Sequence, residues 1–268
     1  MTRGEVTFHP EVPNVARMYD YMLGGKDNFA VDREAARRTF DVLGEDVVRG
    51  GVLQNRLFLG RAVRRLASDL GIRQFLDIGA GLPTMGSVHE VARAVAPGSR
   101  VAYVDNDPVV ITHARDMLHG VDGTTVVDRD LTDPEGIVTD PRVRSLLRFD
   151  EPIAVLLVAI LHFVPDADDP RGLASALMTA APPGSFLVIS HLSADHYAAT
   201  REAAVVYEEA SSGLYPRARA SLRALFGGLP LLDPCDLVWT SQWHPDPGTP
   251  PTDSPGGAAL WCGIARKP

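Results

Sequence analysis

The stretch Gln74-Phe-Leu-Asp-Ile-Gly-Ala-Gly-Leu-Pro-Thr-Met85 joins an apolar run to an acid and a turn that contains glycine. The apolar residues on either side of Asp77 are typical of a short strand buried on both faces of a parallel sheet. Asp77 lies near the carboxyl end of this strand, where open parallel sheets bind their ligands. Gly79 and Gly81 have no side chains that would keep a ligand away from the backbone. The stretch therefore predicts a ligand site at the end of a central strand.

A second buried strand, Val101-Ala-Tyr-Val-Asp105, also ends in a carboxylate and follows Gly81 by 24 residues. A carboxylate at the tip of the second strand can accept hydrogen bonds from both hydroxyls of a ribose. The turn after the first strand lacks the third glycine of the dinucleotide fingerprint, and Pro83 stands where that loop would begin its helix. The two strand ends together favour a ligand that contains a ribose.

Apolar runs alternate with helical patterns from residue 73 onward. Strands are expected at 73–78, 100–105, 124–129, 152–159 and 184–190, and helices at 86–96, 108–119, 134–147 with a break at Pro141, 170–181, 194–211 and 216–226. This spacing indicates repeated strand–helix units and hence a parallel sheet. Two further strands, at 236–243 and 258–265, have no helical stretch between them and are expected to form a hairpin.

Helices are also expected before the first strand. Apolar residues repeat at helical spacing over 15–23, 32–43 and 52–70, and Gly71 is a candidate C-terminal cap for the third helix. The chain is therefore predicted to divide into a helical lid or cover section over residues 1–72 and one compact unit over 73–268.

Composition narrows the function classes. A net charge of −8 argues against general binding to nucleic acid, which needs a concentrated basic surface. Cys235 and Cys262 are far apart and form neither a disulfide framework nor a metal-binding spacing, so no metal site is expected. The N-terminus has no apolar core of signal-peptide length, and the longest apolar run, 153–161, is too short to span a bilayer. A cytoplasmic protein without a membrane partner is therefore expected.

The order of the strand-end motifs resembles that of a known superfamily. An acid-Gly-x-Gly turn follows strand one, an acid follows strand two, and Asp128-Arg-Asp130-Leu131 follows strand three. This order is similar to that of the seven-stranded, Rossmann-like methyltransferases that depend on S-adenosylmethionine, over about residues 73 to 265. The resemblance implies an α/β fold with a mostly parallel sheet and an antiparallel last strand, preceded here by the helical section.

A more specific resemblance covers nearly the whole chain. Its motifs are the glycine turn quoted above, Ala16-Arg-Met-Tyr-Asp-Tyr-Met-Leu-Gly-Gly-Lys-Asp-Asn-Phe-Ala-Val-Asp-Arg33, Val88-His-Glu-Val-Ala92, Tyr103-Val-Asp-Asn-Asp-Pro108 and Leu161-His-Phe-Val-Pro-Asp166. Together they resemble a bacterial family of S-adenosylmethionine-dependent methyltransferases long classed as a domain of unknown function. The resemblance implies S-adenosylmethionine as the cofactor and a methyl acceptor that the sequence does not identify, expected to be a small molecule.

The resemblance also assigns cofactor contacts to residues at the strand ends: Asp77, Gly79, Gly81, Asp105, Asn106, Asp130, Leu131 and Ala159. The first strand end would surround the methionine part, the second would hold the ribose, and the third would flank the adenine. Because both Asp105 and Asp107 follow the second strand, the choice between them for the ribose stays open. The structural alternatives are a tight turn for the glycines and a loop-capping role for Asp77.

The turn Gly24-Gly-Lys-Asp-Asn28 has neither the spacing nor the preceding strand of a phosphate loop, which excludes a nucleoside triphosphatase. As part of the family-like segment, it is expected to fold over the cofactor as a lid, with Tyr21, Lys26 and Asn28 reaching inward. The alternative is a helix C-cap with a solvated lysine.

A methyl acceptor must be aligned with the donor, and an acceptor that carries a proton needs a base. His162 is the first candidate, because it directly follows the fourth strand and imidazole titrates near neutral pH. His191, just after the fifth expected strand, is the second. A core histidine that is hydrogen-bonded to the backbone is the structural alternative for His162.

Two other functions stay open from the sequence. An NAD-dependent dehydrogenase would use the same strand-two acid for its ribose, although the missing glycine leaves less room for a pyrophosphate. A non-catalytic, cofactor-binding regulatory protein would keep the pocket without turnover. The sequence does not indicate an oligomeric state.

Overall fold

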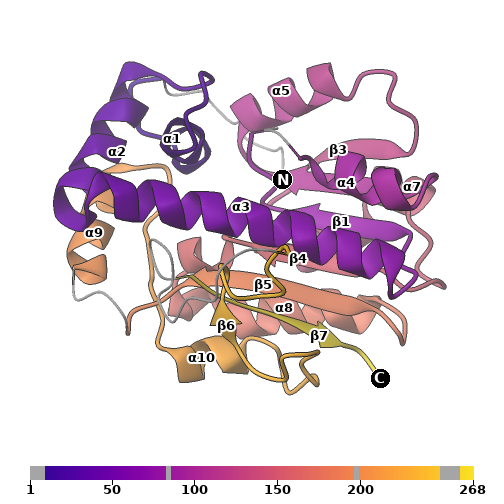
Figure 1. Cartoon of the computed structure of the whole chain (residues 1–268). Helices are drawn as coiled ribbons and strands as arrows, with labels where there is room; N and C mark the ends of the chain where they lie inside the picture. The colour runs from indigo at the N-terminus through magenta and orange to yellow at the C-terminus, as the bar shows by residue number, and fades with distance from the viewer. Residues whose placement is uncertain (1–9, 83–85, 196–198, 248–259) are drawn as a thin grey trace.

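The computed structural model describes residues 10–82, 86–195, 199–247 and 260–268 (Figure 1). These residues form a seven-stranded sheet with the order β3-β2-β1-β4-β5-β7-β6. The strands are β1 (Gln74–Ile78), β2 (Arg100–Asp105), β3 (Thr124–Asp128), β4 (Ala154–Val158), β5 (Phe186–Leu192), β6 (Val238–Trp239) and β7 (Leu260–Arg266). Neighbours from β3 to β5 pair in parallel, and β7 is antiparallel to both β5 and β6. The predicted α/β fold with an antiparallel last strand is confirmed.

The sixth strand is shorter than the predicted range 236–243. After β6, the amides of Gln242 and Trp243 both donate to the carbonyl of Trp239, so the chain turns instead of continuing along the sheet. The Trp243 side chain is buried, and its ring lies edge-on against Phe58 with 5.3 Å between centroids. The end of the predicted strand, which includes Trp243, therefore packs in the core instead of extending the sheet. The predicted hairpin of the last two strands is nevertheless present.

Helices connect the strands and cover the two faces of the sheet. They are α4 (Val88–Val95), α5 (Pro108–Met117), α6 (Pro134–Thr139), α7 (Pro141–Leu146), α8 (Pro170–Ala180) and α10 (Arg219–Ala224). An Asp-Pro pair begins each of α5, α6, α7 and α8. The aspartate accepts a backbone N–H of the first turn, and proline needs no donor at the first helical position. The break predicted at Pro141 arises in this way.

The two faces of the sheet carry separate apolar cores, as β1 illustrates. Phe75 packs with residues of α3, α4 and α5, whereas Leu76 and Ile78 pack with residues of α6, α7, α8 and α10. Because side chains alternate along a strand, Asp77 shares the face of Phe75. Asp77 therefore ends its strand on the side that α3 covers.

The section before the sheet contains α1 (Val15–Met22), α2 (Ala30–Leu43) and α3 (Glu45–Ser68). α1, α2 and the first half of α3 share a third core with residues in and after α9 (Thr200–Val206). From Phe58 to Ala67, α3 instead packs into the core under the sheet, and it runs along the sheet in Figure 1. By packing, the second half of α3 belongs with the sheet, and its first half belongs with α1 and α2.

α3 has 24 residues, yet it contains charged side chains throughout. Among the residues that the structure describes, no helix combines the length and the apolar character that crossing a membrane would require.

Candidate active site

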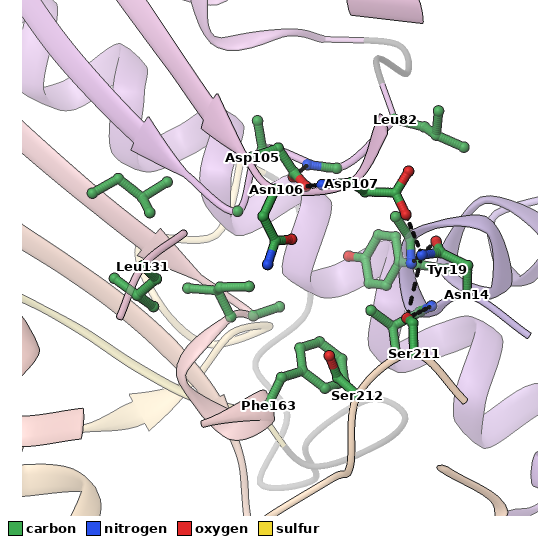
Figure 2. A pocket seen from close by; sticks show the side chains of 18 of the residues that line it. Asn14, Tyr19, Leu82, Asp105, Asn106, Asp107, Leu131, Phe163, Ser211 and Ser212 are labelled. Atoms are coloured by element: carbon green, nitrogen blue, oxygen red, sulfur yellow. Dashed lines mark hydrogen bonds between the residues drawn. The ribbon is translucent and has the colours of Figure 1, made fainter. Parts of the chain in front are cut away.

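A cavity of about 510 Å³ lies at the carboxyl ends of β1, β2, β3 and β4, with α1 on its other side (Figure 2). This volume is typical of cofactor and small-molecule sites. The residues predicted at the strand ends all line it: Asp77, Gly79, Gly81, Asp105, Asn106, Asp130, Leu131 and Ala159. The parallel strands thus bring these positions together.

The turn after β1 depends on its two glycines for different reasons. Both have a positive φ, 70° for Gly79 and 64° for Gly81. A Cβ on Gly79 would lie 2.5 Å from the side chain of Ile160, whereas a Cβ on Gly81 would meet nothing within 4 Å. Gly79 is therefore required by packing and conformation, and Gly81 leaves open space in the wall of the cavity.

Replacing Gly79 by alanine is expected to destabilise the protein by about 2–4 kcal/mol, since strain from the positive φ adds to overpacking against Ile160. Gly81→Ala should cost about 1–2 kcal/mol, because only the conformational strain applies. Urea denaturation of both variants measures the difference. Equal losses would contradict the role assigned to the contact with Ile160.

Asp105 holds the two loops that border the cavity. Its Oδ2 accepts the Gly81 amide at 3.0 Å, and its Oδ1 accepts the Asp107 amide at 3.0 Å. Burial raises the pKa of Asp105 to about 6, although these backbone donors act in the opposite direction. Each carboxylate oxygen can accept a further hydrogen bond, so Asp105 can bind a ligand while it fixes both loops.

Asp107 has a different role from Asp105, although both follow β2. Its Oδ1 accepts the amides of Val109 and Val110 and so caps α5. Its Oδ2 accepts the side-chain amide of Asn14, which also donates to the Ser211 hydroxyl at 3.2 Å, as the dashed lines of Figure 2 show. Asp107 therefore ties the start of α1 to the rim of the cavity.

Asp130 lies after β3 and is held by its own turn. Its Oδ1 accepts the amide and hydroxyl of Thr132 at 2.8 and 2.7 Å, and its Oδ2 accepts the Asn106 side chain at 2.7 Å. Burial raises the pKa of Asp130, but the Thr132 and Asn106 bonds outweigh it and leave the pKa below the ordinary value. The carboxylate is therefore fixed in its ionised form, next to the apolar side chain of Leu131.

Asp77 differs from these acids because none of the described residues donates a hydrogen bond to its carboxylate. The side chain is only 5% exposed. Burial raises its pKa to about 7, the charge of Arg56 lowers it, and the charge of Asp105 raises it further. A buried carboxylate without a donor is costly, so its position in the cavity wall indicates a cationic ligand.

A chain of hydrogen bonds fixes the backbone after β4. Ala159 has a φ of 55°, and its amide donates to the Ser190 hydroxyl at 3.0 Å. That hydroxyl donates to Asn55 Oδ1 at 2.5 Å, and Asn55 Nδ2 donates to the hydroxyl of Tyr19 at 3.0 Å. The chain links β4, β5, α3 and α1 around the cavity, and it holds Ala159 in a conformation that alanine rarely adopts.

The two predicted bases, His162 and His191, do not line the cavity. His162 is 6% exposed, and its Nδ1 accepts the Leu192 amide at 3.3 Å. Burial, together with the charge of Arg217, lowers the pKa of His162 to about 3. His191 is also buried, its pKa is lowered chiefly by burial, and its Nε2 lies 2.9 Å from Arg217 Nη1. Both are neutral core histidines in this structure, which does not support their prediction as bases.

The predicted lid residues Tyr21, Lys26 and Asn28 are not among those that line the cavity either. Asn28 Nδ2 donates to Asp20 Oδ2 at 2.8 Å and to the Gly25 carbonyl, and Lys26 is exposed. The Tyr21 ring stacks on Phe40 with 6.2 Å between centroids. The turn therefore closes on Asp20, and the exposed Lys26 agrees with the alternative of a helix C-cap with a solvated lysine. α1 does line the cavity, but through other residues: Val15, Ala16, Arg17, Tyr19 and Asp20.

Several cavity residues were missed by sequence reasoning: Asn14, Tyr19, Asn55, Arg56 and Ser211. Figure 2 shows Tyr19 and Phe163 facing the space opposite Asn106. A usable signal existed for Asn55, because a polar residue interrupts the buried face of α3. Tyr19 lies in an apolar stripe that resembles ordinary core.

The strand order, the glycine turn and the acids that meet at one cavity define the class of S-adenosylmethionine-dependent, Rossmann-like methyltransferases. A family model described as S-adenosyl methyltransferase matches residues 2–268. The chain belongs to this family. The protein is therefore a methyltransferase whose cofactor is S-adenosylmethionine, and the dehydrogenase alternative finds no support.

Solved structures agree with this assignment. A proposed methyltransferase from Thermobifida fusca is 38% identical, with a TM-score of 0.89, and the match covers 96% of each chain. A DUF574 family protein from Streptomyces avermitilis is 37% identical, with a TM-score of 0.91, and the match covers 97% of this chain and 99% of that one. The N-methyltransferase NodS from Bradyrhizobium japonicum, in complex with S-adenosyl-L-homocysteine, is 14% identical, with a TM-score of 0.50 over 94% of this chain and 99% of that one, and shows the fold alone. Comparison with curated proteins gave no match.

Proposed function

We propose that the cavity is the methyl-transfer site and that its acceptor is a small molecule. The observation that carries this proposal is the buried Asp77 carboxylate, which lines the cavity without a hydrogen-bond donor from any described residue. S-adenosylmethionine carries positive charge on its ammonium and sulfonium groups, so an unpaired carboxylate fits its methionine end. Asp105 also lines this space and is close enough for its charge to raise the pKa of Asp77.

The other strand-end residues fit the remaining parts of the cofactor. Asp105 keeps lone pairs for the two ribose hydroxyls while it binds the backbone of Gly81 and Asp107. Asp130 and Leu131 offer an acceptor and an apolar surface next to each other, which suits an adenine ring and its amino group. Asn106 holds Asp130 in place at 2.7 Å. We therefore assign the adenosine to the ends of β2 and β3.

The bound cofactor supplies an electrophilic methyl group, so the protein must align the acceptor and exclude water. Tyr19, Phe163 and Ser212 line the cavity on the side away from Asp105. α1 and the segment at Ser211 close that side through the bonds of Asn14. A cavity of about 510 Å³ that α1 partly covers favours a small acceptor over a nucleic acid, in line with the net charge of −8. We also propose a cytoplasmic location, on the sequence features given above.

Isothermal titration calorimetry with S-adenosylmethionine, S-adenosylhomocysteine and NADH tests the proposal. We expect binding of both adenosyl ligands at micromolar concentrations and none of NADH. Binding that survives substitution of both Asp77 and Asp105 would place the cofactor elsewhere. Screening small-molecule pools for the formation of S-adenosylhomocysteine would then identify the acceptor class and would separate an enzyme from a regulatory protein.

A further inference from the structure

The turn Gly24-Gly-Lys-Asp-Asn28 is built around the carboxylate of Asp20, in the last turn of α1. Asp20 Oδ2 accepts the Asp27 amide at 2.9 Å and the Asn28 side-chain amide at 2.8 Å. A Cβ on Gly25 would lie 2.0 Å from Asp20 Oδ1, so glycine is needed where the turn closes on this side chain. The turn itself does not line the cavity, but it fixes the position of a residue that does.

Asp20 lines the cavity together with Ala16 and Tyr19 of the same helix. Residues four apart share a face of a helix, so the side chain of Asp20 starts from the face that Ala16 presents to the cavity. Asp20 is only 3% exposed. Its carboxylate therefore lies between the turn on one side and the cavity on the other.

The turn accounts for only one of the two carboxylate oxygens. Among the described residues, none donates a hydrogen bond to Asp20 Oδ1. Holding the turn requires one acceptor oxygen, which an asparagine would also supply. Burying a second carboxylate oxygen without a donor is unfavourable unless a ligand provides that donor. A molecule in the cavity can do so.

The charge of the cavity wall indicates which kind of donor fits. Aspartates outnumber arginines among the residues that line it: Asp20, Asp77, Asp105, Asp107, Asp130 and Asp168 against Arg17, Arg56 and Arg129. Two of these arginines are paired with acids outside the lining, Asp32 and Asp140. The aromatic faces of Tyr19 and Phe163, which also attract cations, face the same space (Figure 2). A cationic donor is therefore favoured over a neutral one.

We propose that Asp20 binds the methyl acceptor and that the acceptor is an amine, which binds as a cation with an N–H donated to this carboxylate. This inference rests on the proposed function and names the substrate class of the same site. The acids at the ends of β1, β2 and β3 lie on the opposite wall, where the cofactor is assigned. Asp20, from α1, is available to the second substrate.

NMR titration of the protein saturated with S-adenosylhomocysteine tests this inference with three probes of similar size: benzylamine, benzyl alcohol and benzoate. We expect benzylamine to bind about 10- to 100-fold more tightly than benzyl alcohol, the range for a hydrogen bond to a charged group, and benzoate to bind most weakly. Asp20→Asn should lower the affinity for benzylamine to that for benzyl alcohol, because asparagine keeps an acceptor for the turn and loses the charge. The affinity for S-adenosylhomocysteine should stay unchanged.

Two further variants separate binding of the acceptor from support of the turn. Asp41→Asn, at an exposed position of α2, loses the same charge and should change none of these affinities. Asn28→Ala removes one donor to Asp20 Oδ2 but keeps the carboxylate. It should therefore lower the melting temperature and preserve the preference for benzylamine.

The outcomes separate this inference from the proposed function. If the unaltered protein binds S-adenosylhomocysteine but does not prefer benzylamine, or binds none of the probes, the inference is wrong and the proposed function stands. This comparison does not depend on the folding of any variant. A folded Asp20→Asn variant that keeps the preference, or that loses affinity for S-adenosylhomocysteine, would also overturn the inference. If the unaltered protein does not bind S-adenosylhomocysteine, both proposals are wrong.

Discussion

Asp105→Asn is expected to weaken the binding of S-adenosylhomocysteine by about 100-fold or more. Two ribose hydroxyls would donate to a carboxylate in the unaltered protein, and each such charge-assisted bond contributes about 1.5–3 kcal/mol. An asparagine has one acceptor oxygen, which cannot serve Gly81, Asp107 and the ribose together. Calorimetry measures the affinity. Thermal unfolding of the ligand-free variant shows whether the substitution also destabilises the two loops that Asp105 holds.

Asp107→Asn is the matched control, because the sequence leaves open which of these acids holds the ribose. The oxygens of Asp107 are already used by the first turn of α5 and by Asn14. Asparagine caps helices about as well as aspartate, so α5 should keep its start. We expect an affinity within about tenfold of the unaltered protein. A larger loss from Asp107→Asn than from Asp105→Asn would reverse the assignment.

The strand-end part of the site could be predicted because it follows from chain order alone. The ends of neighbouring parallel strands meet at one edge of a sheet, so residues such as Asp77, Asp105 and Asp130 converge whatever the details of packing. The Asp-Pro pairs likewise place helix starts from local chemistry. These predictions need only local structure and the order of the strands.

The other half of the site depends on long-range packing that the sequence does not reveal. Asn55 and Ser190 are separated by 135 residues and meet only because α3 docks across β4 and β5. His162 lies in a short turn, Leu161–Phe163, in which neighbouring side chains point to different sides. Phe163 lines the cavity, whereas His162 is buried beside His191. Proximity in sequence to a strand end was therefore insufficient to identify a base.

Asp77→Asn should stabilise the ligand-free protein at pH 8 and abolish most of its affinity for the cofactor. In the folded protein, burial raises the pKa of Asp77 from 3.8 to about 7. Between these values the folded state binds more protons than the unfolded state, so stability falls as pH rises from about 4 to about 7. The full difference corresponds to about 4 kcal/mol, which sets the upper limit of the gain. Asparagine removes the buried charge, so the variant should be about 1–4 kcal/mol more stable at pH 8, with a smaller gain of at most about 1.6 kcal/mol at pH 5.

Urea denaturation of the ligand-free protein at both pH values measures this gain, with Asp116→Asn, at an exposed position, as the matched control for the loss of one charge. The affinity for the cofactor should change with pH in the opposite direction to the stability of the ligand-free protein. A cationic ligand binds the ionised carboxylate, so affinity for S-adenosylmethionine should rise up to about tenfold per pH unit below pH 7 and level off above it. Asp77→Asn should remove the part of that dependence that belongs to Asp77 and leave only the part of Asp105, whose pKa is raised to about 6. Loss of stability at pH 8 in the variant would mean that Asp77 supports the fold, and then its unpaired carboxylate would no longer argue for a cationic ligand.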